Sequence, residues 1–135
     1  MHYGTVNDAV EAGVTLTILG DNGTTEHINF VIDTGLTEET TLPQEVISRL
    51  NLTLANDGDD FEITLADGTT TAPMIYTVRI LWHDRLREIE VVNMETDPLI
   101  GMKLLRGSNL SVDAVPGGQV TITELPPTSQ TETLS

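Results

Sequence analysis

The chain has 135 residues, a formal net charge of −15, 39% hydrophobic residues and no cysteine. This length allows one domain with a modest core. Six lysines and arginines are too few for an extensive basic face, so nucleic acid and anionic membranes are not expected partners. Without cysteine, disulfides and thiolate chemistry are excluded. The sequence has no apolar run that could span a bilayer and no recognisable signal peptide, so we expect a cytoplasmic protein.

The first predicted elements form a β-hairpin. Apolar residues alternate with threonine at 14–19, which is typical of a half-buried strand. The Asn-Gly pair at 22–23 is a strong signal for a hairpin turn. Residues 27–32 form the returning strand, which ends at Asp33. After a polar turn, the apolar residues of 43–50 fall on one side of a short predicted helix.

The remaining predicted elements are also short. Alternating or apolar segments predict further strands at 61–65, 75–82, 88–92, 99–100, 110–115 and 120–125. A second short helix is predicted at 102–107, where a glycine ends it. The polar residues 126–135 are expected to form a disordered tail, which leaves 1–125 as the domain. Many short strands with few helices predict a mostly β fold, a small barrel or sandwich.

The sequence contains no pattern typical of a metal site or of a nucleophilic catalytic site. The three histidines are scattered and lack the spacing of zinc ligands. Asp57, Asp59 and Asp60 crowd around Gly58, but this stretch lacks the length and the final glutamate of a calcium loop. We therefore expect neither a bound metal nor another cofactor.

The predicted strand that ends at Asp33 is the most informative feature. Asp33 follows two apolar residues, and Gly35 permits a tight turn that would present the carboxylate, while the Thr34 hydroxyl could hold the turn. A plainer interpretation is an aspartate that bonds the backbone N–H groups of its own turn. The pattern has a weak echo at Leu99-Ile100-Gly101, where an apolar strand again meets a glycine and a short helix.

Together these segments resemble the retropepsin-like aspartic proteases, a family that includes retroviral proteases and single-domain bacterial homologues. The resemblance covers the chain to about Leu125. The matching segments are "VIDTG", "TLPQEVISRLNL", "LADGTT" and "DPLIGMKLLRGSNLSVD", with "YGTV" and "GGQVTI" as in the bacterial homologues. The resemblance implies a closed-barrel-like half-domain with one or two short helices that is active as a homodimer. No cofactor is implied.

The resemblance also implies an endopeptidase mechanism. Two aspartates would share a proton and activate a water that attacks the peptide bond. The chain has one Asp-Thr-Gly motif, so Asp33, Thr34 and Gly35 would form half of the site and a second copy the other half. The implied substrate-binding residues lie along the cleft and at the tip of a flap. They are Val31, Leu36, Leu99 and Ile100 in the cleft, and Asn56, Asp57, Gly58 and Asp59 in the flap.

Three features depart from the retroviral pattern. Leu36 stands where alanine or serine is usual, Met102 stands where arginine is usual, and the expected flap tip is acidic. Losing the arginine removes a dimer-stabilising ion pair, so activity could depend on concentration. Two alternatives therefore stay open: a binding or assembly module without useful catalysis, and a monomer whose site assembles only on a partner or at high concentration.

Overall fold

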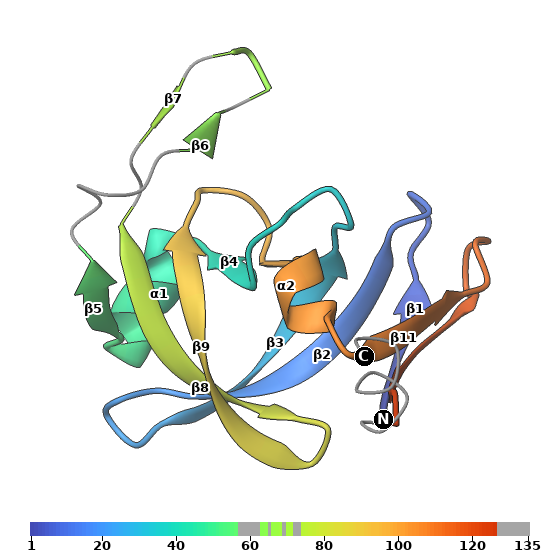
Figure 1. The fold of residues 1–135 in the computed structure, drawn as a ribbon, viewed down its shortest axis with the longest axis horizontal. Coiled ribbons are helices and arrows are strands. Elements are labelled where there is room, and N and C mark those ends of the chain that lie inside the picture. The colour runs from blue at the N-terminus through green and yellow to red at the C-terminus, as the bar shows by residue number, and fades with distance from the viewer. Residues whose placement is uncertain (57–62, 65, 69, 72–73, 127–135) are drawn as a thin grey trace, which may run out of the picture.

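The computed structural model describes residues 1–56, 63–64, 66–68, 70–71 and 74–126. Within these ranges the protein is mostly β with two short helices (Figure 1). The strands and helices in chain order are β1 (His2–Val6), β2 (Ala12–Leu19), β3 (Thr25–Ile32), β4 (Thr40–Leu42), α1 (Gln44–Leu50), β5 (Thr53–Asn56), β6 (Ile63–Thr64), β7 (Thr70–Thr71), β8 (Ile75–Trp82), β9 (Arg85–Asn93), β10 (Leu99–Ile100), α2 (Met102–Leu105), β11 (Ser108–Val112) and β12 (Gln119–Glu124). No helix in these ranges is long and apolar enough to cross a membrane.

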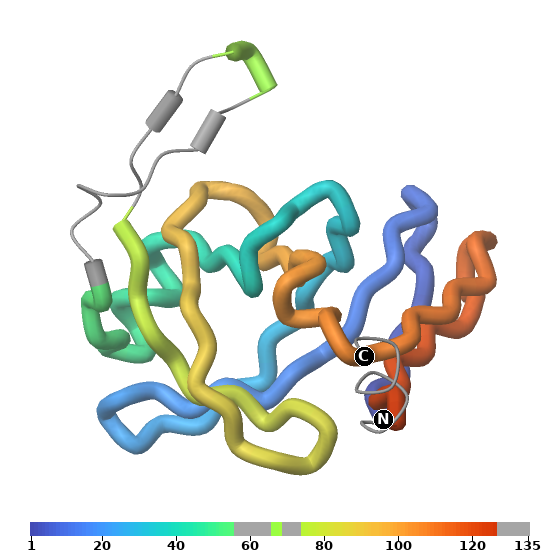
Figure 2. Tube along the Cα trace, viewed as in Figure 1, coloured from blue at the N-terminus to red at the C-terminus, as the bar shows by residue number. Residues whose placement is uncertain are grey.

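A closed barrel lies at the centre of the fold. Ten strands form one sheet in the order β11-β12-β1-β2-β3-β10-β4-β9-β8-β5. A further pairing of β2 with β8 closes the six strands from β2 to β8 in that order into a barrel, visible in Figure 1. The N-terminal strand β1 pairs with β12, so the two ends of the described chain lie side by side (Figure 2). The mostly β, barrel-like fold expected from the sequence is confirmed.

The barrel core consists almost entirely of aliphatic side chains. On β2, Val14, Leu16 and Ile18 are buried, while Thr15 between them is exposed. This is the alternation that predicted the strand. The other barrel strands bury a similar set of residues: Ile28, Phe30, Leu42, Val78, Ile80, Trp82, Ile89, Val91 and Ile100. Each large apolar side chain that is fully buried stabilises the fold by about 1.5–3 kcal/mol.

Both predicted helices are present, with shifted ends. α1 buries Val46, Ile47 and Leu50 and ends at Asn51, whose left-handed conformation (φ 52°) closes the helix. α2 covers only 102–105, because the chain leaves the helix before Gly107, which has a φ of 86°. The helices are therefore where the apolar pattern predicted them.

The strand predictions were incomplete at the edges. The predicted strand 88–92 begins earlier, at Arg85, and the last hairpin joins 108–112 to 119–124. Of the predicted strand 61–65, only Ile63–Thr64 lies within the described residues. The short or irregular strands β1, β4 and β5 were missed, since few of their residues alternate. The predicted tail lies outside the described residues from 127 onward, so it stays a prediction.

Candidate active site

Asp33 follows directly after β3, at a place where three strands meet. The two-residue strand β10 lies between β3 and β4, parallel to the first and antiparallel to the second. Leu99 pairs with Val31 on one side and with Thr41 on the other. The backbone N–H of Asp33 donates to the carbonyl oxygen of Ile100 at 2.9 Å. Strands that are distant in sequence therefore hold the backbone of Asp33 in place.

The turn after Asp33 orients its carboxylate. The backbone N–H of Gly35 donates to Asp33 Oδ1 at 2.9 Å, and that of Leu36 donates to the Asp33 carbonyl at 3.1 Å. Asp33 is half-buried, while Thr34 and Gly35 are exposed. The bond to Oδ1 is the turn contact that the plainer interpretation expects. Oδ2 has no hydrogen-bond partner among the described residues.

Gly101 packs directly against the loop that follows the Asp33 turn. Its N–H donates to the carbonyl of Glu39 at 2.9 Å, and the N–H of Met102 donates to the carbonyl of Leu36 at 2.8 Å. A Cβ added at Gly101 would lie 2.1 Å from the carbonyl oxygen of Glu38. Because Gly101 has an ordinary φ of −105°, it is this close approach that requires glycine.

Glu39 anchors the same loop through a side chain that is only 8% exposed. Its Oε1 accepts the backbone N–H of Glu90 at 2.9 Å, and its Oε2 accepts Arg87 at 3.1 Å. A buried carboxylate with both oxygens bonded holds the loop against β9. Sequence reasoning missed this residue, because nothing local distinguishes it from the other acidic residues of the turn.

The family assignment agrees with this geometry. A family model described as "gag-polyprotein putative aspartyl protease" matches residues 16–107, which is more than half of the chain and includes both glycine turns. The chain belongs to this family. The aspartyl protease resemblance inferred from the sequence segments is thereby confirmed. No curated protein sequence matches the chain.

A solved structure supports the fold of this aspartyl protease domain. The crystal structure of a retropepsin-like aspartic protease from Rickettsia conorii superimposes with a TM-score of 0.57. The match covers 91% of this chain and 88% of the other, at 18% sequence identity. At that identity the likeness concerns the fold, and it confirms a retropepsin-like barrel.

The cleft residues expected from the sequence lie around the Asp33 turn. Val31, Leu36 and Leu99 are each half-buried, so part of each side chain is open to solvent. Ile100 is fully buried in the barrel core. Its side chain can support the site, and its carbonyl holds Asp33, but it presents no surface to a ligand in this conformation.

The expected flap lies mostly beyond the described residues. Asn56 ends β5, and Asp57, Gly58 and Asp59 fall outside the described ranges. The assignment of these residues to a flap therefore remains a prediction. In the described part of the chain, no group of three or more histidine, aspartate or glutamate side chains could hold a metal ion.

A cavity of about 470 Å³ opens beside this site on the outer face of β1, β2 and β3. Val31, two residues before Asp33, borders it. Glu11, in the turn between β1 and β2, also borders it. Glu11 could not be recognised from the sequence, because its place at the Asp33 end of the β2–β3 pair follows from strand pairing alone.

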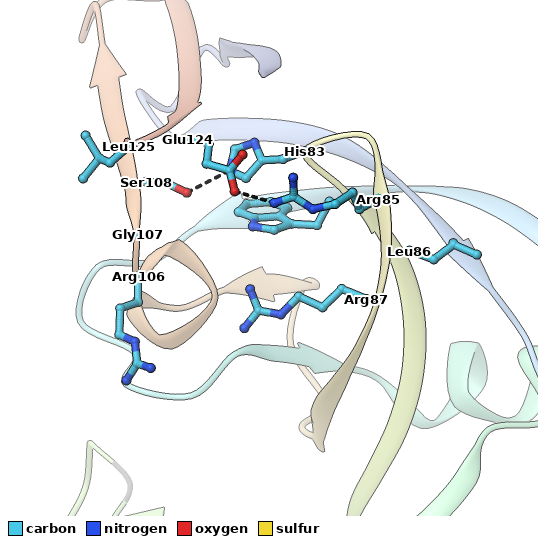
Figure 3. Close-up of a pocket in the computed structure, with 10 residues that line it drawn as sticks. His83, Arg85, Leu86, Arg87, Arg106, Gly107, Ser108, Glu124 and Leu125 are labelled. Atoms are coloured by element: carbon cyan, nitrogen blue, oxygen red, sulfur yellow. Dashed lines mark hydrogen bonds and ion pairs between the residues drawn. The ribbon is translucent and has the colours of Figure 1, made fainter. Parts of the chain in front are cut away.

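A second cavity, of about 380 Å³, lies away from Asp33, where the β8–β9 turn meets β11 and β12 (Figure 3). Arg85 forms an ion pair with Glu124 across it, and His83 Nε2 lies 2.8 Å from Ser108 Oγ. Arg106 borders the same cavity. None of the residues that border this cavity belongs to the Asp33 turn, so we do not assign it to the active site.

Two histidines and a tryptophan pack together behind this second cavity. The His2 ring stacks on Trp82 at 4.5 Å between ring centroids, and His2 Nε2 accepts the backbone N–H of His83 at 3.0 Å. Burial, followed by the nearby His83, lowers the pKa of His2 to about 4. Burial also lowers the pKa of His83. The cluster therefore favours neutral rings, and the bond to His2 Nε2 requires one.

Proposed function

We propose that this chain is an aspartic endopeptidase that acts as a symmetric homodimer, with Asp33 of each copy supplying one of two catalytic carboxylates. The observation that carries the proposal is the Asp33 turn. A half-buried carboxylate ends a barrel strand, its Oδ1 is fixed by the Gly35 N–H, and its Oδ2 has no partner among the described residues. Membership of the aspartyl protease family supports the same assignment.

The proposed reaction uses the two carboxylates in different protonation states. Two close carboxylates do not both ionise readily, so the pair holds one proton. The ionised member takes a proton from a water between them, and the water oxygen attacks the carbonyl carbon of the peptide bond. The protonated member donates a hydrogen bond to the developing oxyanion. Transfer of a proton to the nitrogen then breaks the C–N bond and releases an acid and an amine.

The dimer follows from the need for two carboxylates. The chain has one Asp-Thr-Gly motif, so the second aspartate must lie across a two-fold axis. Thr34, which is exposed, would lie at this axis and bond the partner turn. The half-buried Val31, Leu36 and Leu99 would contact an extended peptide substrate.

The flap assignment belongs to the same proposal. Asn56, Asp57, Gly58 and Asp59 would cover the peptide from above. The proposed catalysis depends on the Asp33 turn and not on these residues.

The first test is Asp33→Asn, with Asp113→Asn as a control that removes the same charge from an exposed turn. Asp33→Asn should abolish peptide cleavage and leave the circular dichroism and the sedimentation coefficient unchanged. Asp113→Asn should cleave like the wild type. Cleavage by Asp33→Asn at the wild-type rate would rule out the mechanism.

A mixing experiment tests the need for two copies. Wild-type chains in a large excess of Asp33→Asn chains would form mostly mixed dimers with one carboxylate each. With a ninefold excess, activity per wild-type chain should fall to roughly a tenth if subunits exchange freely. Unchanged activity would mean that one carboxylate suffices. If wild-type protein that sediments as a dimer cleaves no peptide at mildly acidic or neutral pH, the binding-module alternative is favoured instead.

A further inference from the structure

The cavity beside Val31 has a floor of backbone and a rim of polar groups. Gly4 and Gly13 border it, so two adjacent strands present backbone there instead of side chains. Val31 supplies a half-buried apolar wall. A recess of about 470 Å³ with these walls has room for one long side chain of a bound peptide.

Among the described residues that border this cavity, Glu11 is the one charged side chain. It is held in position by Asn7 through several bonds. The Asn7 amide donates to Glu11 Oε1 at 2.9 Å, and Asn7 Oδ1 accepts the backbone N–H of Glu11 at 2.9 Å. A carboxylate fixed in this way loses little conformational freedom when it binds a cation.

Glu11 and Asp33 lie at the same end of the β2–β3 pair. Gly13 pairs with Val31, and each of the two acidic residues is two positions beyond that pair. Paired strands lie about 4.8 Å apart and rise about 3.3 Å per residue. A peptide held with its scissile bond at Asp33 would therefore place a neighbouring side chain within reach of the cavity.

The basic residues of the chain are located elsewhere. They lie on α1, β8, β9 and the α2 region, and they are Arg49, Arg79, Arg85, Arg87, Lys103 and Arg106. Three of them border the second cavity (Figure 3). In the described part of the chain, no ion pair neutralises Glu11. The site beside Asp33 is thus negative within a chain of net charge −15.

We propose that Glu11 is a specificity-determining residue that selects peptides with a lysine or arginine close to the scissile bond. The cationic side chain enters the cavity, its aliphatic stem lies along Val31, and its charged end meets the Glu11 carboxylate. This inference rests on the proposed endopeptidase function and adds a substrate class to it.

The test uses three sets of peptides that differ at one position near the scissile bond. This position holds lysine in one set, glutamine in the second and glutamate in the third, and it is moved along the peptide on both sides of the scissile bond. At one position the wild type should cleave the lysine peptide with a kcat/KM about three- to tenfold above the glutamine peptide, and the glutamate peptide should be slowest. The preference should shrink as salt is raised.

Glu11→Gln should remove the difference between the lysine and glutamine peptides, and Glu11→Lys should favour the glutamate peptide. Glu88→Gln is the matched control, because it removes the same charge from an exposed position on β9. This control should keep the lysine preference. Since Glu11 is exposed, unfolding temperatures of all variants should match the wild type within a few degrees.

The two proposals can fail separately. Equal cleavage of lysine and glutamine peptides by the wild type at every position, or equal loss of preference in Glu11→Gln and Glu88→Gln, overturns the role of Glu11. In both cases the Asp33-dependent cleavage still stands. If no peptide in any set is cleaved, the proposed endopeptidase function fails and this inference fails with it.

Discussion

The two glycine turns of the barrel are weakly alike in local sequence and very different in their surroundings. Gly35 follows β3 and is exposed, whereas Gly101 follows β10 and is buried. A Cβ at Gly35 would have only Asp33 Oδ1 nearby, at 3.3 Å, while a Cβ at Gly101 would lie 2.1 Å from a backbone oxygen. The first glycine leaves open space in front of a carboxylate, and the second allows two backbone segments to touch.

The contrast distinguishes residues proposed to act in catalysis from residues that stabilise the fold around them. β3 and β10 lie side by side and parallel, and each runs into a glycine. At the first turn a carboxylate follows the last strand residue, whereas at the second turn the glycine directly follows the fully buried Ile100. Substitutions at the Gly101 turn should therefore reduce stability, and substitutions at the Asp33 turn should reduce activity.

The largest expected effect is at Gly101. Gly101→Ala forces the loop that carries Glu38 away from the helix start, so the free energy of unfolding should fall by at least about 3 kcal/mol. Urea unfolding followed by circular dichroism measures this. Gly117→Ala, at an open turn with positive φ, is a useful comparison because its cost is backbone strain alone. A Gly101→Ala variant as stable as the wild type would contradict the close approach.

The Glu39 side chain holds the loop that follows the Asp33 turn against β9, and its loss should have the next largest effect. Glu39→Ala leaves the N–H of Glu90 without its partner and frees Arg87, which should cost about 2 kcal/mol of unfolding free energy. Glu39→Gln keeps an acceptor for Glu90 and should recover part of this loss. If Glu39→Ala costs less than about 0.5 kcal/mol, the loop does not depend on this contact.

Gly35→Ala tests whether a substitution at the Asp33 turn reduces activity more than stability. The new methyl group would press on Asp33 Oδ1 and displace the carboxylate by a few tenths of an ångström. Stability should change by less than about 1 kcal/mol, whereas kcat should fall roughly tenfold, because catalysis depends on carboxylate position. Steady-state kinetics and urea unfolding on the same preparation separate the two effects. A large loss of stability without a loss of kcat would reverse the assignment of the turns.

The smallest predicted effect is a pH dependence from the far end of the barrel. The pKa of His2 is about 4 in the folded chain and near 6.5 when unfolded, so the unfolded chain binds more protons between these values. The contribution of neutral His2 to the free energy of unfolding is therefore complete above about pH 6.5, and it is lost as the pH falls towards 4. His2 is partly exposed, so solvent reduces the effect of its pKa shift. We expect His2 to account for a fall of about 1 kcal/mol in the free energy of unfolding between pH 7 and pH 5.

Two histidine variants check this origin. His2→Gln should lose less stability between pH 7 and pH 5 than the wild type, measured by urea unfolding at both values. His27→Gln, which alters an exposed histidine on β3, should keep the full pH dependence. The same pH dependence in the wild type and in His2→Gln would place the titrating group elsewhere.

Local patterns predicted the parts of the molecule whose structure is set by near neighbours. The alternation at 14–19 and 75–82 predicted β2 and β8, and the Asn-Gly pair placed the first hairpin turn, where Gly23 has a φ of 82°. The apolar side of 43–50 predicted α1. The family segments around Asp33 identified the candidate site. In each case the deciding contacts lie within a few residues along the chain.

Contacts between distant segments decided the rest. β4 has three residues, all buried, and no alternation, and it forms because β10 and β9 pair with its two sides. The place of Glu11 at the Asp33 end of the β2–β3 pair, and the bond of Glu39 to β9, depend on the same kind of long-range pairing. The sequence by itself determined the longer barrel strands, such as β2, β3 and β8, and the Asp-Thr-Gly turn, since hydrophobic periodicity and turn chemistry are local. Only the tertiary structure decided where Glu11 and Glu39 lie relative to the Asp33 turn, because strand register brings residues together without regard to their separation in sequence.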